Sequence, residues 1–222
     1  MVDTELYNLK SLTYLNLDGN KFKNISMGKL INKPKTVKAV SMSNNLLTYI
    51  RLEYFDPLIN LEYYLNLAFN KISYIGGAFM FLKKLNTLIL SYNNLAKLDT
   101  YDIPFMCESS LEYIAIDHNL VMFIDTSEVL NDLPFLKKIA IMGNPWYCNC
   151  LRDFRKGLQE RKIQEINDSD YVNTKRTVCF ADLTTNNKCS ISTSKFVSIV
   201  LEDDRGLPLN TNTTSCHLNE FE

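Results

Sequence analysis

Apolar and polar residues follow one short pattern that returns at almost regular intervals along this chain. Each copy reads apolar-x-x-apolar-x-apolar-x-x-Asn, and the copies end at Asn20, Asn45, Asn70, Asn93, Asn119 and Asn144. The middle apolar residues stand at positions 15, 40, 65, 88, 114 and 139, so the steps are 25, 25, 23, 26 and 25 residues. Alternate side chains of an extended segment face opposite sides, so the last two apolar residues point inward. The pattern predicts six short strands.

Further apolar columns follow each Asn. They lie two places on (Phe22, Leu47, Ile72, Leu95, Val121), five places on (Ile25, Ile50, Ile75, Leu98, Ile124) and near ten places on (Leu30, Phe55, Phe79, Ile103, Val129). One copy cannot bury this set alone, whereas stacked copies form a continuous core. We expect short parallel strands on one side of the stack and irregular segments with single 3₁₀ turns on the other. Because the irregular side is wider, the sheet should be concave.

The Asn column stands where the chain leaves each strand. Backbone groups in such a turn lack sheet partners, and a buried amide can both donate to them and accept from them. We therefore expect a ladder of buried asparagines. The third copy differs, because one extra residue separates Leu61 from Leu65. That insertion predicts a bulge that re-aims the side chains of the third strand.

The last copy, residues 136–144, runs directly into Asn-Pro-Trp-Tyr-Cys-Asn-Cys at 144–150. This junction and the copies before it resemble animal extracellular leucine-rich repeat proteins with a cysteine-rich C-terminal cap, such as Toll-type receptors, Slit-like guidance ligands and insect immune proteins. The resemblance implies an α/β solenoid of leucine-rich repeats in residues 1–143. It also implies a disulfide-stapled cap in residues 144–222.

The start of the expected cap carries a helical pattern. Its apolar residues are Leu151, Phe154, Leu158 and Ile163, and its polar residues Arg152, Asp153, Arg155 and Lys156 are expected on the outer face. Asn149 is placed to cap the start of this helix. We expect the helix to cover the open end of the sixth repeat and Trp146 to plug that end. The alternative role for Trp146 is binding of an aromatic or apolar ligand.

Five of the six cysteines, at 148, 150, 179, 189 and 216, lie in the last third of the chain. Such spacing is typical of an extracellular disulfide framework, although a zinc site is the competing interpretation. The absence of C-x-x-C pairs and of nearby histidine ligands disfavours zinc. The resemblance implies that Cys148 pairs with Cys179 and that Cys150 pairs with Cys216. Cys189 is then an extra cysteine that could meet Cys107.

Three Asn-x-Ser/Thr sequons, at Asn24, Asn167 and Asn212, fit an extracellular compartment. The chain enters its first repeat almost at once, without a cysteine-bearing N-terminal cap. Because a terminal repeat otherwise exposes half of its core, we expect either a fragment of a longer protein or a first turn that caps itself.

Composition narrows the choice of partner. The chain has 222 residues, of which 46% are hydrophobic and 22% are charged, and its net charge is −1. We expect a folded domain that binds neither nucleic acid nor a membrane surface through bulk charge. We also expect no transmembrane segment in this chain, because it contains no continuous apolar run of the required length.

Catalytic signals are weak. The two histidines are His118, beside Asp117 at an outward strand position, and His217 near the C-terminus, and no Ser or Cys is fixed beside either by the sequence. The chain carries no phosphate-binding loop, zinc protease motif or dinucleotide fingerprint. We expect no enzyme, no metal site and no cofactor.

Outward positions of the expected sheet and its turns supply the candidate ligand-binding residues. These are Tyr14, Tyr64, Phe69, Tyr92, Tyr113, Asp117 and His118. Amphipathic aromatic side chains favour protein recognition, although aromatics on a sheet can instead brace one another. We expect an extracellular module, secreted or part of an ectodomain, that binds a protein ligand or co-receptor in innate immunity or cell-surface signalling. The alternatives are a matrix or adhesion protein, a fragment of a membrane receptor ectodomain, and an intracellular scaffold.

Overall fold

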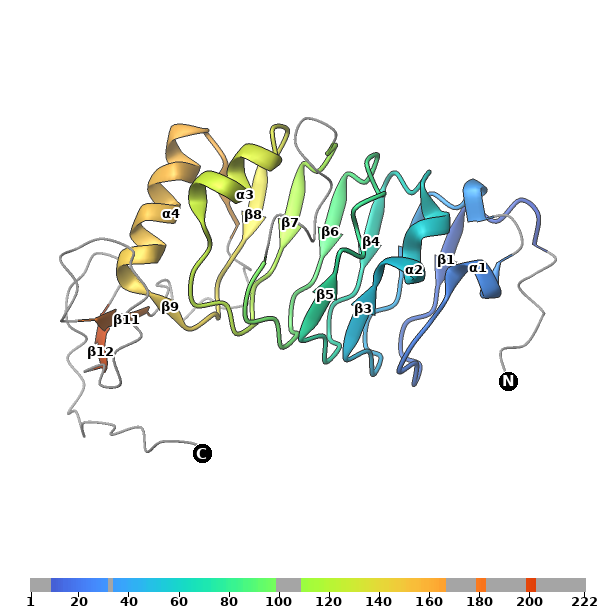
Figure 1. The fold of residues 1–222 in the computed structure, drawn as a ribbon, viewed down its shortest axis with the longest axis horizontal. Helices are drawn as coiled ribbons and strands as arrows, with labels where there is room; N and C mark the ends of the chain where they lie inside the picture. Colours follow the sequence, from blue (N-terminus) through green and yellow to red (C-terminus); the bar gives the residue numbers. More distant parts are fainter. Residues whose placement is uncertain (1–8, 32–33, 99–108, 167–178, 183–198, 203–222) are drawn as a thin grey trace.

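A computed structural model describes residues 9–31, 34–98, 109–166, 179–182 and 199–202. Its main element is a parallel sheet of seven strands, and successive coils of the chain stack along the long axis of the molecule (Figure 1). In order across the sheet, the strands are β1 (Tyr14–Asn16), β2 (Ala39–Ser41), β4 (Tyr64–Asn66), β6 (Thr87–Ile89), β7 (Tyr113–Ala115), β8 (Lys138–Ala140) and β10 (Gln164–Glu165).

The strand register confirms the pattern of inward positions. Leu15, Val40, Leu65, Leu88, Ile114 and Ile139 pair in one continuous row, and all six are buried. The columns that follow the Asn positions are buried as well, apart from the half-buried Phe22, which packs against the core, and Ile103, which lies outside the described residues. Each coil thus supplies one layer of a continuous apolar core.

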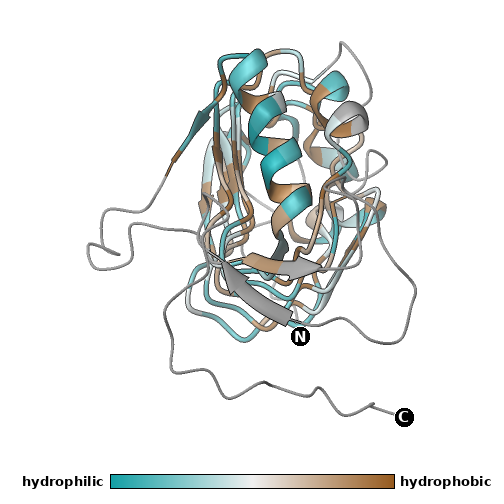
Figure 2. Cartoon of the chain, turned by 90° about the vertical axis from the view of Figure 1, so that its left-hand side faces the viewer, coloured by the Kyte–Doolittle hydropathy of each residue, from teal (hydrophilic) through white to brown (hydrophobic). Residues whose placement is uncertain are grey.

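Short helices and a second small sheet form the other sides of the stack (Figures 1 and 2). The helices are α1 (Met27–Leu30), the 3₁₀ turns η2 (Pro34–Thr36) and η3 (Asp56–Leu58), α2 (Leu52–Phe55) and α3 (Thr126–Asp132). Strands β3 (Tyr49–Arg51) and β5 (Tyr74–Gly76) pair in parallel. These segments turn the chain back toward the next strand of the main sheet.

The insertion in the third repeat does not re-aim the side chains of its strand. Tyr64 pairs with Ala39 on one side and with Thr87 on the other, in the regular register of the sheet. The extra residue is absorbed before β4, where the N–H groups of Glu62 and Tyr63 both donate to the Lys38 carbonyl. The expectation that these side chains point differently was wrong, because the buried residues of the two neighbouring strands fix the register of β4.

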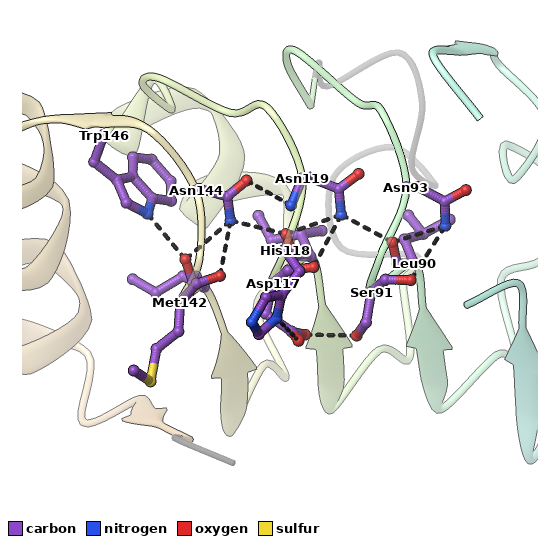
Figure 3. A network of polar contacts seen from close by, with 11 residues as sticks. Leu90, Ser91, Asn93, Asp117, His118, Asn119, Met142, Asn144 and Trp146 are labelled. Atoms are coloured by element: carbon purple, nitrogen blue, oxygen red, sulfur yellow. Dashed lines mark hydrogen bonds and ion pairs between the residues drawn. The ribbon is translucent and has the colours of Figure 1, made fainter. Parts of the chain in front are cut away.

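The expected asparagine ladder is present. Asn93 illustrates it: its Nδ2 donates to the carbonyl oxygens of Leu90, Ser91 and Leu67, and its Oδ1 accepts from the N–H of Ile72. Asn45 and Asn70 bond in the same way, each to its own turn and to the preceding coil. Asn119 and Asn144 continue the ladder beside Asn93, as Figure 3 shows. Each amide satisfies backbone groups that no strand reaches.

Asn20 departs from the expected burial. It is exposed, and among the described residues it donates only to Leu17 and Asp18 of its own turn. The reason is positional, because β1 is the outermost strand of the described sheet and no described coil packs on its outer side. Within residues 9–166 as described, the first member of the ladder therefore makes no bond to an earlier coil.

Helix α4 (Cys148–Glu160) covers the far end of the stack, as the end view in Figure 2 shows. Its residues Leu151, Phe154 and Leu158 are buried, and so is Trp146, in agreement with the expected plug. The Trp146 ring lies 6.1 Å from the Phe154 ring, and its Nε1 donates to the Ile141 carbonyl. The indole is buried and its N–H already has a partner within the protein, which disfavours the alternative of ligand binding.

Two expectations for this helix were wrong. The helix begins at Cys148, so Asn149 lies inside it and accepts a hydrogen bond from Arg152 instead of capping the start. Arg155 does not face solvent, because its guanidinium makes two hydrogen bonds, of 2.6 and 2.7 Å, to the carboxylate of Glu165. Both groups are largely shielded from solvent, and the bidentate geometry is the strong form of such a pair.

Glu165 belongs to a seventh strand that the repeat pattern did not reveal. Strand β10 pairs in parallel with β8, and Glu165 stands opposite the inward residue Ile139. Ile163, expected at the end of the helical pattern, is buried just before this strand. A charged residue thus takes the inward position at the last strand, and Arg155 neutralises it where the apolar core ends.

Cys148 and Cys179 form the expected disulfide, with Cα atoms 5.0 Å apart. The bond joins the start of α4 to β11 (Cys179–Asp182), which lies between β9 (Trp146–Tyr147) and β12 (Ile199–Glu202). Cys150 is also disulfide-bonded, while cysteines 107, 189 and 216 lie outside the described residues. The pairing of Cys150 with Cys216, and the boundary between repeats and cap at residues 143 and 144, therefore stay predictions.

In the part of the chain that the structure describes, no helix meets the length and apolarity that a membrane crossing requires.

We predict that Asn93→Ala lowers the free energy of unfolding by roughly 3 kcal/mol, because it leaves several buried backbone groups without partners. Asn20→Ala is the matched control, since that amide is exposed and bonds only to its own turn. Urea denaturation followed by circular dichroism measures both. Equal losses for the two variants would contradict a ladder that acts between coils.

We predict that Gly157→Ala destabilises the protein, although Ala in place of Gly favours an exposed helix by about 1 kcal/mol. A Cβ at Gly157 would lie 2.4 Å from Thr126 Cγ2 and 3.2 Å from Leu130 Cδ1, where α3 packs on α4. Overpacking of this kind costs about 1–3 kcal/mol. Thr126→Ser removes the clashing methyl and should restore stability in the double variant. A rise in melting temperature for Gly157→Ala alone would contradict this packing.

Candidate interaction surface on the sheet and its turns

The residue before each ladder Asn adopts a left-handed backbone conformation. This column consists of Gly19, Asn44, Phe69, Tyr92, His118 and Gly143, with φ between 53° and 69°. The N–H of each of the first five donates to a carbonyl of the next coil. The hydrogen-bond ladder therefore imposes the conformation whatever the side chain. Gly and Asn tolerate it, whereas Phe, Tyr and His adopt it at a cost of about 1–2 kcal/mol each.

Three of the predicted candidates stack in this column. The Phe69 and Tyr92 rings lie 4.4 Å apart at 10°, and the Tyr92 and His118 rings lie 4.1 Å apart at 4°. We name Phe69, Tyr92 and His118 the turn stack. Phe69 remains 53% exposed at its open end. At the other end the His118 ring lies against Gly143, where an added Cβ would be 2.6 Å from His118 Cδ2.

Asp117 lies beneath the turn stack rather than outward. It is only 9% exposed, which corrects its prediction as a solvent-facing strand position. Its Oδ1 accepts from the Ser91 hydroxyl at 2.5 Å, and its Oδ2 lies 2.9 Å from His118 Nδ1 (Figure 3). His118 itself belongs to the turn after β7, since that strand ends at Ala115. Asp117 is therefore placed to orient the His118 ring.

The order of these three groups does not support nucleophilic catalysis. A serine nucleophile needs the imidazole as its base, but here Ser91 donates to the carboxylate and the carboxylate stands between Ser91 and His118. Among the residues that the structure describes, no cluster of His, Cys, Asp and Glu has the composition of a metal site.

Tyr14 and Tyr64 meet elsewhere on the sheet face, by which we mean the outward side of the seven strands. Their rings lie 6.0 Å apart, edge to face, across β1, β2 and β4. Burial, followed by a hydrogen bond with Tyr14, raises the pKa of the Tyr64 hydroxyl to about 12. Tyr113 is half-buried between Thr87 and Lys138 of the neighbouring strands.

Ion pairs tie neighbouring coils at the edge where the strands begin. Lys38 bonds to Glu62 at 2.8 Å, and Lys137 bonds to Glu112 at 2.7 Å. Hydrogen bonds with these lysines lower the pKa of both carboxyl groups. All four side chains remain partly exposed, so the pairs contribute charge pattern to this surface more than stability.

The other candidate residues have separate positions. Asn24 is exposed in the first coil, whereas Asn167 and Asn212 lie outside the described residues. Sequence reasoning missed Ser91, which anchors Asp117, and Gly143, which ends the turn stack. The signal for Gly143 was present, because the column before each Asn already contained Gly19 and Asn44, the residue types that favour positive φ.

Comparison with known proteins agrees with this architecture. The model of the leucine rich repeat family matches residues 35–95, which contain β2, β4 and β6. With the parallel sheet and the disulfide at its C-terminal end, the match defines an α/β leucine-rich repeat solenoid. Domains of this fold generally mediate interactions between proteins. A comparison with curated proteins finds no match for the chain.

We predict that the stability of the protein falls as the pH rises from 10 to 12. The unfolded chain releases the Tyr64 proton near pH 10, whereas the folded protein retains it to about pH 12, so deprotonation favours unfolding in this window. Tyr64→Phe should flatten this part of the stability curve. Tyr14→Phe should lower the Tyr64 pKa without restoring its ordinary value, because burial remains. Absorbance titration of the tyrosinates measures the pKa, and a Tyr64 that titrates near 10 in the folded protein would contradict the geometry.

Proposed function

We propose that this protein is an extracellular recognition module that binds a protein ligand or co-receptor through the sheet face and the turn stack. A role in innate immunity or cell-surface signalling fits such a module. The observation that carries the proposal is the turn stack itself. Three bulky residues occupy backbone positions that neighbouring coils fill with Gly or Asn, so the sequence retains strain where a less strained residue is available. Retained strain of this kind is typical of functional sites.

The stack has the character of a binding hot spot. Aromatic side chains with few rotatable bonds supply contact area at a low entropic cost, and here they are held rigid before a partner arrives. Phe69 and Tyr92 offer apolar area, while Asp117 holds the His118 ring in place. Leu120 and Met122, which follow His118 along the same coil, are also exposed.

The disulfide supports the extracellular part of the proposal. Cys148 and Cys179 bond where the cap closes the core, and disulfides persist mainly in oxidising compartments. A matrix or adhesion protein is the second candidate, because the ion pairs and tyrosines of the sheet face also suit contacts between repeated assemblies. An intracellular scaffold fits the disulfide poorly.

We predict that Phe69→Asn weakens ligand binding at least tenfold while changing the free energy of unfolding by less than about 1 kcal/mol. Asn at this position lowers the strain of the left-handed backbone by about 1 kcal/mol. This gain offsets the loss of about 0.5–1.5 kcal/mol of ring stacking. Tyr92→Ala with Tyr113→Ala should weaken binding as well. An array of purified extracellular domains is first screened for a partner of the unaltered protein. Binding of each variant to that partner is then measured by biolayer interferometry.

The matched control is Tyr74→Ala. Tyr74 is 61% exposed but lies on β5, outside the seven-stranded sheet. A partner that binds this control and not Phe69→Asn supports the turn stack as the binding site. Equal binding by both variants, or a loss of stability without a loss of binding, would show that the aromatics only brace the turns.

A further inference from the structure

We propose that Asn24, an exposed residue of the first coil just before α1, carries an N-linked glycan. The inference rests on the extracellular location proposed above, and it concerns a different surface from the turn stack. Asn24, Ile25 and Ser26 form a sequon in a segment without helix or strand, before α1. The acceptor side chain must project into solvent for a folded protein to keep such a glycan.

The alternation of side chains places Asn24 on the surface. Ile25 is buried in the same column as Ile50 and Ile75, so alternation places Asn24, the residue before Ile25, on the outer side. Asn24 is exposed, and within the described part of the chain its amide has no hydrogen-bond partner. The side chain is thus free to carry a sugar without the loss of a contact.

The Ser26 hydroxyl is not used to cap α1, although its carbonyl accepts from the N–H groups of Lys29 and Leu30. Ser26 stands at the N-cap of α1, where a serine hydroxyl usually accepts a hydrogen bond from the first turn, yet its side chain makes no capping bond. The hydroxyl is the group that a glycosyl transferase requires in a sequon. Because it makes no capping bond, the hydroxyl is available for this recognition.

Asn24 occupies the place in the first coil that Tyr49 and Tyr74 occupy in the next two, and Tyr74 is 61% exposed. The equivalent position therefore faces solvent in the third coil as well as in the first.

The test uses the full chain, secreted from insect cells behind an added signal sequence, with Asn167→Gln and Asn212→Gln to leave one sequon. Peptide mapping after enzymatic deglycosylation in heavy-oxygen water reports whether Asn24 was modified. We expect a glycan on Asn24 that Asn24→Gln and Ser26→Ala both abolish and that Ser26→Thr retains. Ser26→Ala should keep its melting temperature after deglycosylation, because the hydroxyl makes no capping bond.

An unmodified Asn24 in secreted, disulfide-bonded protein overturns the inference. If that protein still binds its partner from the array of extracellular domains, the proposed function stands without the glycan.

Discussion

The asparagine ladder is the interaction on which the rest of this structure depends. Each amide joins two successive coils at the point where neither has a strand to supply hydrogen bonds, so the coils stack in one register. Because the turn then follows the same path in every repeat, the residue before the Asn is held at positive φ. Because of the ladder, equivalent residues of successive repeats lie next to one another in a column.

That column explains how a solenoid with a uniform backbone acquires one distinctive surface. Stacking of adjacent rings contributes about 0.5–1.5 kcal/mol for each pair, and left-handed backbone costs about 1–2 kcal/mol for each bulky residue. Two stacked pairs thus contribute about 1–3 kcal/mol against about 3–6 kcal/mol of strain at three residues. Stacking offsets the whole strain only where the largest gain meets the smallest cost. Stability alone therefore favours Gly or Asn at Phe69, Tyr92 and His118. The proposed contact with a partner accounts for three rings that packing within the chain does not favour.

The repeat spacing was enough to predict the strands, their parallel pairing, the buried rows and the asparagine ladder, because each follows from periodicity and the alternation of side chains. The pairing of Cys148 with Cys179 came from the resemblance instead. The turn stack was predicted residue by residue but not as a unit, since stacking depends on ring orientation in a turn. The burial of Asp117 and the pairing of Arg155 depend on contacts between distant segments, which the local pattern of either segment does not contain.

The C-terminal end shows why a periodic pattern cannot reveal its own termination. A seventh apolar strand would demand an eighth coil to cover it, so the sheet ends with Glu165 at the inward position. A lone buried carboxylate would be costly, but Arg155 reaches it from α4 with two hydrogen bonds. Phe154 of the same helix packs against Trp146. The apolar residues of α4 therefore cover the end of the core, while Arg155 pairs with the last strand of the sheet. The cap works because one helix meets both an apolar surface and a charged strand.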